Sequence, residues 1–251
     1  MKKGRGEPRE LEVIKSKLIS QNMLRVTLGG VGMNNFPEGF AGGYIKLRLT
    51  GEEESEVVTR TYTIRNQRNN EIDVDFVLHG HNGGPASRWA AKCKRGDKIL
   101  IGGPGPKTIV DSNKDWILIV GDMTALPAIS VNIEQLPLET IGYIVVEIFD
   151  EADIQALPVP KGVQLNWLLN PEPGKNSSVL ADFVKKIDWL DGQVSAWVAS
   201  EFNSMRNLRD YLQNVRRLKK ENLYISSYWK LGSNEESHRK AKSRDRQAAR
   251  L

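Results

Sequence analysis

Apolar and polar residues alternate along short segments in the first half of the chain. Every second residue from Ile72 to Leu78 is apolar, and Asp73 and Asp75 lie between them, which is the period of a half-buried strand. Further segments of this kind are rich in β-branched residues and are separated by clusters of Gly, Asn and Pro. With the first, they span 11–19, 23–29, 44–50, 57–66, 71–79 and 98–102. The pattern predicts a small barrel of antiparallel strands, interrupted by one helix over 85–94.

The pattern changes near residue 114, after which strands alternate with helices. Residues 116–120 form a continuous apolar run, as in a strand that is buried on both faces. The remaining segments are strands over 141–149, 163–169, 194–199 and 223–228, and helices over 125–135, 178–189 and 202–216. From Met205 to Val215 apolar side chains recur at helical spacing and form a face that packs on a sheet. Strands that alternate with helices predict βαβ units and a parallel sheet.

The excess of positive charge is confined to the end of the chain. The 251 residues include 36 Lys and Arg against 31 Asp and Glu, a formal net charge of +5. The segment 238–251 holds six cations and one acid, which leaves 30 of each sign before it. Attraction of a polyanion needs a basic patch on the body of a domain, so nucleic acid is not the expected partner. We expect a β-barrel domain over 1–113, an α/β domain over 114–232 and a basic C-terminal helix or tail over 233–251.

Composition narrows the class of protein further. With 39% hydrophobic residues the chain can bury cores, which excludes a disordered chain and a small disulfide-stapled domain. Cys93 alone forms no intramolecular disulfide, and no apolar segment follows the basic start of the chain. We therefore expect a cytoplasmic protein with no membrane insertion. We expect a monomer, although the sequence itself does not decide the number of subunits. Three histidines, one cysteine and no metal-ligand spacing predict no metal site in the protein.

The first candidate motif is Arg60-Thr61-Tyr62-Thr63-Ile64-Arg65, at the end of a predicted strand. Arg60 and Tyr62 project to the same side of a strand, so a guanidinium can bind a phosphate while a phenol ring lies along an aromatic ring system or a ribose. Thr63 points the other way, and its backbone and hydroxyl can reach the edge of such a ring system. An ordinary strand with a core Tyr and two surface arginines explains the hexapeptide equally well.

A second motif lies in the segment 79–90. Gly84 and Pro85 stand where a helix begins, because Pro is tolerated in the first turn. The exposed amides that open this helix then form an anion site together with the helix dipole, which predicts a cradle for a pyrophosphate. A plain loop with ordinary histidines at His79 and His81 is the alternative. The two motifs together favour the cradle.

Five segments of the chain resemble the siderophore-interacting protein family, a branch of the ferredoxin-reductase superfamily. They are RTYTIR, DVDFVLHGHNGGPASRWA, GDMTALPAIS, AWVASEFNSMRNLRDYL and YWKLGSNEE, in this order over essentially the whole chain. Members of the family bind FAD and reduce ferric siderophores. The resemblance implies a ferredoxin-reductase-like fold, in which an N-terminal antiparallel six-stranded FAD-binding β-barrel precedes a C-terminal parallel α/β domain that binds NAD(P)H.

The resemblance also implies roles for individual residues. Those that bind FAD are Arg60, Thr61, Tyr62, Thr63, Ile64, Val77, His79, Gly84, Pro85, Ala86, Ser87 and Trp89. Those that bind NAD(P)H are Gly121, Asp122, Thr124, Ala125, Glu201 and Trp229. Those that bind the anionic ferric chelate are Lys46, Lys107, Arg239, Lys240 and Arg246. Thr63, near the reactive edge of the flavin, and Lys46 are the catalytic candidates. Core packing of Trp229, a solvent-facing Lys46 and a solvated tail are the alternatives.

The expected function is FAD-dependent reduction of a ferric siderophore or another anionic ferric chelate, with electrons from NADH or NADPH and release of Fe(II). One alternative is a flavin reductase that exchanges electrons with ferredoxin. Another is a non-catalytic protein that binds nucleic acid through the basic tail. The sequence does not decide between NADH and NADPH, because Arg206 and Arg209, which can hold a 2′-phosphate, are also ordinary residues of a helix surface.

Overall fold

The chain folds into two compact units. The computed structural model describes residues 7–51, 56–79 and 83–248. The first unit extends to Thr108 and includes Ser130–Asn132, and the second contains Ile109–Ile129 and the chain from Ile133 onwards. Gly80, His81 and Asn82, in the middle of the second motif, lie outside the described residues.

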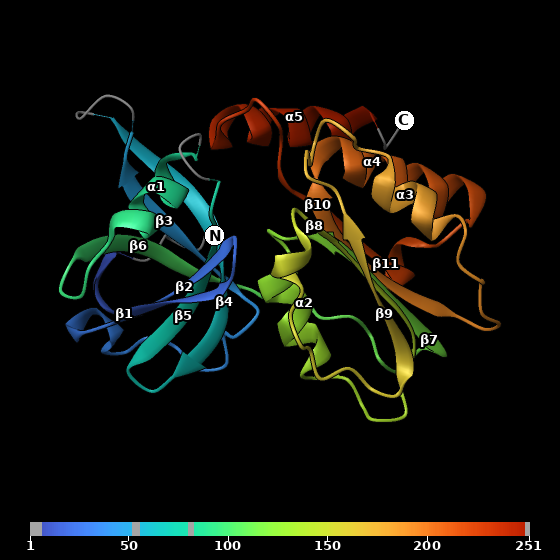
Figure 1. The fold of residues 1–251 in the computed structure, drawn as a ribbon, viewed down its shortest axis with the longest axis horizontal. Helices are drawn as coiled ribbons and strands as arrows, with labels where there is room; N and C mark the ends of the chain where they lie inside the picture. The colour runs from blue at the N-terminus through green and yellow to red at the C-terminus, as the bar shows by residue number, and fades with distance from the viewer. Residues whose placement is uncertain (1–6, 52–55, 80–82, 249–251) are drawn as a thin grey trace, which may run out of the picture. The chain divides into compact units, whose positions relative to one another are not determined.

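The first unit is a closed barrel, coloured blue to green in Figure 1. Its six antiparallel strands are β1 (Arg9–Ser20), β2 (Met23–Gly29), β3 (Tyr44–Thr50), β4 (Val57–Arg68), β5 (Glu71–Val77) and β6 (Lys98–Gly105), in the order β1-β2-β5-β4-β3-β6. A 3-10 turn, η1 (Val31–Met33), follows β2, and helix α1 (Pro85–Lys92) follows β5. The predicted six-stranded antiparallel barrel is confirmed.

Strand β3 shows how the alternating pattern builds this barrel. Ile45 and Leu47 are buried in the barrel core, whereas Tyr44 and Lys46 on the alternate positions are exposed. Burying each of these branched side chains contributes about 1.5–3 kcal/mol. Strand β5 ends at Val77, two residues before its predicted end, and the N–H of the next residue, Leu78, donates to Asn22 O at 2.9 Å.

The second unit contains a parallel sheet of five strands, coloured green to red in Figure 1. They are β7 (Trp116–Asp122), β8 (Ile141–Ile148), β9 (Gly162–Leu169), β10 (Val194–Glu201) and β11 (Leu223–Trp229), in the order β11-β10-β7-β8-β9. The helices are α2 (Leu126–Ile133), α3 (Val179–Val184), α4 (Phe202–Asp210) and α5 (Glu235–Ala248), with 3-10 turns η3 (Glu151–Asp153) and η5 (Lys220–Asn222). Trp116, Leu118 and Val120 pack with residues of α3 and α4 in one core on one face of the sheet. The predicted parallel α/β domain is confirmed.

One predicted helix of this unit is too long, and another changes its helical type along its length. The helix expected over 178–189 ends at Val184, where the N–H of Lys186 turns back to Phe183 O at 2.9 Å. The apolar residues beyond it, such as Trp189, pack on the same core from a non-helical segment, which extends the apolar pattern past the helix. The helix expected over 202–216 changes after α4 into a π-helical segment, η4 (Tyr211–Val215).

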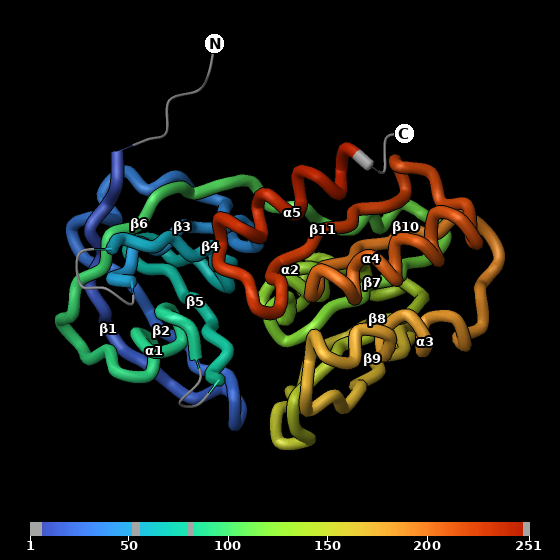
Figure 2. Tube along the Cα trace, turned by 90° about the horizontal axis from the view of Figure 1, so that it is seen from above, coloured from blue at the N-terminus to red at the C-terminus, as the bar shows by residue number. Residues whose placement is uncertain are grey.

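Helix α5 packs on its own unit through one face, and Figure 2 shows it running beside β11. His238 is buried, and its Nε2 lies 2.6 Å from the Ser227 hydroxyl of β11. Lys242 Nζ donates to Ser227 O at 2.7 Å, and Asp245 forms an ion pair with Arg209 of α4. The basic end of the chain is therefore a helix as far as it is described. None of the helices in the described ranges is long and apolar enough to span a membrane.

Candidate functional site

In the barrel, β4 and β5 are paired over the C-terminal part of β4. Their ladder runs from Ile64 opposite Val74 to Arg68 opposite Glu71. Strand β3, by contrast, pairs with β4 from Thr63 back to Val57. The two strands therefore separate at the end of the Arg-x-Tyr-Thr motif, between Thr63 and Ile64. A strand edge that leaves its neighbour is where a ligand can reach the backbone.

Arg60 and Tyr62 lie on the same side of β4, as the spacing predicts. Their partners on β3 are the buried residues Leu47 and Ile45. The Tyr62 ring packs 4.4 Å from the buried Phe76 ring, centroid to centroid, and remains half-buried. The guanidinium of Arg60 is also half-buried, and its Nη1 donates to Thr59 O at 2.9 Å. An arginine and a tyrosine thus line one side of the diverging strand.

The start of α1 supplies an anion site close to the end of β5 in sequence. Gly84 is the N-cap and Pro85 the first residue of this eight-residue helix. A Cβ atom added to Gly84 would meet no atom of the described residues within 4 Å. Ser87 is buried, and its Oγ accepts the N–H of His79 at 3.2 Å. The first-turn amides of a helix and its dipole fit the phosphates of a dinucleotide cofactor.

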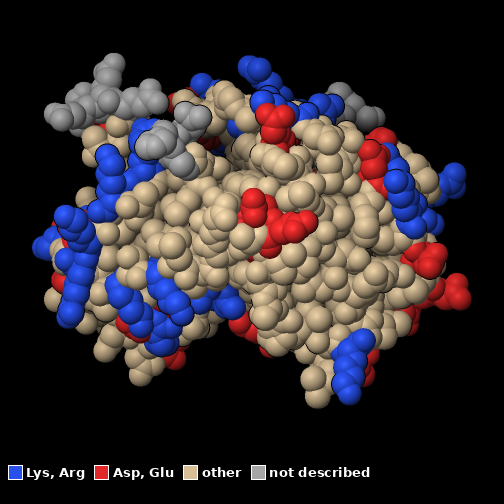
Figure 3. All heavy atoms as spheres, in the orientation of Figure 1, with Lys and Arg blue, Asp and Glu red and all other residues tan. Residues whose placement is uncertain are grey.

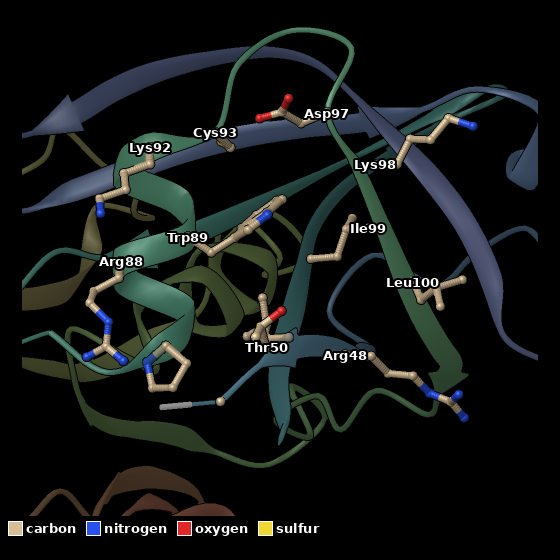
Figure 4. Close-up of a pocket in the computed structure, with 13 residues that line it drawn as sticks. Arg48, Thr50, Arg88, Trp89, Lys92, Cys93, Asp97, Lys98, Ile99 and Leu100 are labelled. Carbon is tan, nitrogen blue, oxygen red and sulfur yellow. The ribbon is translucent and has the colours of Figure 1, made fainter. Parts of the chain in front are cut away.

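A cavity of about 500 Å³ lies beside α1, between the helix and the strands β3 and β6 (Figure 4). Two residues predicted to bind FAD, Pro85 and Trp89, line it. Among the residues that the structure describes, the charged ones that line it are Arg48, Arg88, Lys92, Asp97 and Lys98. Four cations against one acid, beside an aromatic ring, make this cavity suitable for an anionic ligand with an aromatic part.

The outer face of β3 and β4 brings together the two catalytic candidates. Lys46 is opposite Thr61, and Tyr44 is opposite Thr63. Tyr44 and Lys46 are both exposed. Lys107, after β6 in the same unit, is exposed as well. In Figure 3 Lys and Arg side chains gather over the barrel, at the left of the view.

Tyr44 was not among the residues predicted from the sequence. A Cβ atom on Gly105 would lie 2.1 Å from the Tyr44 Cζ, so the ring lies flat over this glycine of β6. Two features identify Tyr44 as a candidate site residue. It is an aromatic residue at one of the exposed, alternate positions of β3, and it is paired with Thr63 of β4. Aromatic rings at such positions supply a flat surface for an aromatic ligand.

At the carboxyl edge of the parallel sheet, Asp122 is the centre of a hydrogen-bonded group. Its Oδ1 accepts the N–H of Thr124 at 2.9 Å and the hydroxyl of Thr124 at 2.5 Å. Its Oδ2 accepts the N–H of Glu201 and the Nε1 of Trp229, both at 2.8 Å. Burial raises the pKa of Asp122, while the four donors favour its charged form.

Glu201 caps the N-terminus of α4. Its Oε2 accepts the N–H groups of Asn203 and Ser204, and its Oε1 accepts that of Leu231 at 3.1 Å. Asp122 and Glu201 are only 2% and 1% exposed. Their oxygens accept the hydrogen bonds that hold the turns of this edge, and direct contact of Asp122 and Glu201 with the nucleotide stays a prediction. Thr124 and Trp229, both half-buried, remain at its surface, whereas Gly121 and Ala125 are buried.

Sequence reasoning missed Glu147, which lies opposite Asp122 in the register of β7 and β8. It is 2% exposed, and its Oε2 has no hydrogen-bond partner within the described part of the chain. Burial, together with the charges of Asp122 and Glu201, raises the pKa of Glu147 to about 7, against a lowering hydrogen bond with Asn170. Two carboxyl groups side by side cannot both ionise cheaply, so Glu147 carries a proton below neutral pH.

We expect Glu147→Gln to stabilise the protein at pH 8 and to change its stability little at pH 4.5. Unfolded Glu147 ionises near its ordinary pKa, whereas the folded protein keeps the proton up to about pH 7. Stability is therefore lost as the pH rises between these values, by up to about 3 kcal/mol. Urea unfolding of both proteins at the two pH values measures the difference. Parallel stability curves for the two proteins would contradict this assignment of the proton.

The basic residues predicted from the tail lie on the exposed side of α5. Arg239, Lys240 and Arg246 are exposed, and Lys240 Nζ lies 2.8 Å from Glu236 Oε1. They belong to the second unit, and Lys46 belongs to the first, so their predicted grouping around one chelate stays a prediction. Within the described ranges, no group of three or more His, Cys, Asp or Glu side chains is placed to hold a metal ion.

The fold has close counterparts among solved structures. A siderophore-interacting protein from Aeromonas hydrophila superposes with a TM-score of 0.84 at 30% identity, covering 96% of this chain and 98% of its own. A ferredoxin-NADP+ reductase from Plasmodium falciparum shares the fold, with a TM-score of 0.67 at 14% identity over 88% of this chain and 96% of its own. Residues 48–108 match the family described as siderophore-interacting FAD-binding domain. The barrel, its match to a family of FAD-binding domains and the parallel sheet together define a flavin-dependent oxidoreductase with a ferredoxin-reductase-like fold.

The second unit and the chain as a whole identify the family. Residues 114–232 match the family described as siderophore-interacting protein. The ferric vibriobactin reductase of Vibrio cholerae is 35% identical to this chain, over 92% of each of the two chains. The chain belongs to the siderophore-interacting protein family. This confirms the predicted family, the predicted fold class and FAD as the cofactor.

Proposed function

We propose that this protein reduces ferric siderophores, with FAD as its cofactor and a nicotinamide dinucleotide as the electron donor. The observation that carries the proposal is the outer face of β3 and β4, where Lys46 and Tyr44 lie in register with Thr61 and Thr63 of the FAD motif. Family membership and the 35% identity to a ferric vibriobactin reductase support it. The protein is then a flavin-dependent ferric-chelate oxidoreductase.

FAD is held by the barrel and by α1. Arg60 binds a phosphate as a forked donor, and Tyr62 lies along the flavin or its ribityl chain. The first-turn amides of α1, with Ala86 and Ser87, bind the pyrophosphate. When bound, the flavin accepts a hydride from the nicotinamide and passes electrons singly to Fe(III). The remaining proposed FAD contacts are Thr61, Thr63, Ile64, Val77, His79 and Gly84.

The ferric chelate binds on the outer face of the barrel. Lys46 and Lys107 are exposed cations of the first unit, and an ammonium group recognises an anionic chelate as a point charge and hydrogen-bond donor. Tyr44 and Thr63 form the pair two residues along the register from Lys46 and Thr61. Anionic oxygen ligands hold the less charged Fe(II) more weakly than Fe(III), so reduction releases the iron.

The dinucleotide binds at the carboxyl edge of the sheet, over the turn 121–125. Ligands of open α/β sheets bind outside the carboxyl ends of the strands, where the strand order reverses. Thr124 supplies a half-buried hydroxyl, and the half-buried ring of Trp229, fixed by its bond to Asp122, supplies an aromatic surface for the nicotinamide. The buried Asp122 and Glu201 position these groups.

The electron donor is tested on one sample of the flavin-loaded protein. NADH, NADPH and reduced ferredoxin are mixed with it separately without oxygen, and bleaching of the flavin absorption is followed by stopped flow. We expect a nicotinamide dinucleotide to reduce the protein faster than ferredoxin. Fast reduction by ferredoxin alone would replace the proposed donor and leave the FAD site and the chelate site untouched.

The cavity beside α1 gives a second prediction, because we assign it to the adenosine end of FAD. Arg48, at its rim, lies opposite Thr59, the residue before Arg60. Arg48→Ala should weaken FAD binding about tenfold, a typical effect of one lost charge-assisted hydrogen bond, and should leave FMN binding unchanged, since FMN lacks this half. Fluorescence titration with both flavins measures the effect. Lys17→Ala, which removes an exposed cation of β1, is the control. If Arg48→Ala weakened the binding of FAD and of FMN equally, the assignment of the cavity to the adenosine end would be contradicted.

A further inference from the structure

The strand order of the second unit fixes where the two halves of a dinucleotide lie, if it binds as proposed above. Strands β8 and β9 lie on one side of β7, and β10 and β11 lie on the other. The strand order reverses between β7 and β10, and a dinucleotide spans this point, with one half to either side. Trp229, at the end of β11, receives the nicotinamide. The adenosine half then lies over the ends of β8 and β9.

The chain that leaves β8 is acidic. Asp150 and Glu151 follow the strand within three residues and are both exposed. Asp150 Oδ1 accepts the N–H of Ala152 at 2.9 Å, which fixes this carboxylate at the start of the turn η3. From residue 149 to residue 160 the sequence contains no Lys or Arg. The first cation, Lys161, directly precedes β9 and therefore lies at the opposite, amino edge of the sheet.

In the loop that follows β9, the positive charge is paired with a carboxylate of the same loop. Lys175, in the loop that follows β9, forms an ion pair with Glu172 at 2.5 Å. The two arginines that the sequence offered for a 2′-phosphate, Arg206 and Arg209, form ion pairs with Asp245 of α5 instead. Arg209 donates to both Asp245 oxygens, at 2.5 and 2.8 Å. These cations hold the terminal helix on its unit.

Behind this rim lie three buried carboxyl groups, those of Asp122, Glu147 and Glu201. They are 2%, 2% and 1% exposed. Oxygens of Asp122 and Glu201 accept hydrogen bonds from the surrounding N–H groups, and charge in a buried site acts over a longer range than charge in water. Glu147, whose Oε2 has no hydrogen-bond partner in the described ranges, lies three residues before Asp150 in the sequence.

We propose that the carboxyl edge of this sheet selects NADH over NADPH, with Asp150 as the specificity-determining residue. A carboxylate at the end of the strand that follows the first βα turn accepts the 2′-hydroxyl of the adenosine ribose and repels a 2′-phosphate. The inference rests on the proposed function, since it requires a dinucleotide at this edge. It adds the choice between the two dinucleotides, which the sequence leaves open.

The test uses the flavin-loaded protein and two ligands that carry no nicotinamide, ADP-ribose and 2′-phospho-ADP-ribose, in isothermal titration calorimetry. We expect ADP-ribose to bind at least about tenfold more tightly at low salt, and this preference to shrink as ionic strength rises. Asp150→Asn keeps an oxygen that can cap η3 and removes the charge, so it should reduce the preference several-fold. Glu139→Gln removes an exposed charge from the loop before β8, at the amino edge, and should leave the preference unchanged.

The outcomes separate the inference from the proposal beneath it. Equal or tighter binding of 2′-phospho-ADP-ribose would overturn the selectivity and leave the dinucleotide site intact. An unchanged preference in Asp150→Asn would overturn the role of Asp150. If neither ligand binds, the dinucleotide site itself is wrong, and the inference falls with it.

Discussion

Replacing Arg60 with alanine should lower the affinity of the protein for FAD about 30- to 100-fold and leave the barrel folded. Arg60 lies on the side of β4 that faces the core, where its guanidinium is half-buried and close to the divergence of β4 from β5. A forked, charge-assisted contact with phosphate in such a place contributes about 2–3 kcal/mol. Arg60→Lys keeps the positive charge but loses the forked pair of N–H donors of the guanidinium. Its affinity for FAD should therefore lie between those of the unchanged protein and Arg60→Ala.

The measurement is the ratio of flavin to protein after purification, followed by fluorescence titration of the stripped protein with FAD. Circular dichroism checks that the variant is folded. Lys17→Ala, which removes one cation from the exposed face of β1, is the matched control. Full flavin occupancy and an unchanged dissociation constant in Arg60→Ala would remove Arg60 from the cofactor site.

Replacing Lys46 with glutamate should slow the reduction of an anionic ferric chelate about tenfold without loss of FAD. Lys46 points outward from β3, in register with Thr61 of β4 and Gly102 of β6, so the substitution reverses a charge beside the flavin motif and leaves the core untouched. Charges at a protein surface interact by about 1–4 kcal/mol at contact distances, and salt should weaken the effect.

The experiment compares two ferric chelates, an anionic tris-catecholate and a neutral tris-hydroxamate, with the same reduced protein. Lys46→Glu should raise the KM for the anionic chelate and change the reaction of the neutral chelate little. Lys17→Glu should change neither. An equal effect of Lys46→Glu on both chelates would show that Lys46 does not act through the charge of the substrate.

Most of the fold could be predicted from the sequence, because the apolar period is local and strong. The alternation along 71–79 and the buried run 116–120 each define a strand, and the Gly84-Pro85 pair marks the start of α1. The end of α3 could not be predicted, since residues such as Trp189 continue the apolar pattern from a loop and pack on the same core. Local patterns report burial, and helix ends depend on which backbone groups find partners.

The same holds for the candidate site, where only the residues of contiguous motifs could be predicted. Arg60 and Tyr62 could be read from a contiguous motif, because side chains two apart on a strand share a face. Glu147 and Tyr44 could not, because their importance comes from the register with Asp122 and with Thr63. The roles of the predicted FAD, nucleotide and chelate residues stay predictions, as do the monomeric state and the cytoplasmic location.

The central claim, that the flavin-loaded protein passes electrons to a ferric siderophore, is tested most directly by mixing reduced protein with ferric chelate. The protein is reduced photochemically without oxygen, mixed in a stopped-flow instrument with a ferric tris-catecholate, and followed by flavin absorption in the presence of a colorimetric Fe(II) trap. The account predicts rapid reoxidation and about two Fe(II) trapped per flavin, since the cofactor carries two electrons. Flavin that stays reduced, with no Fe(II) in the trap, would contradict it.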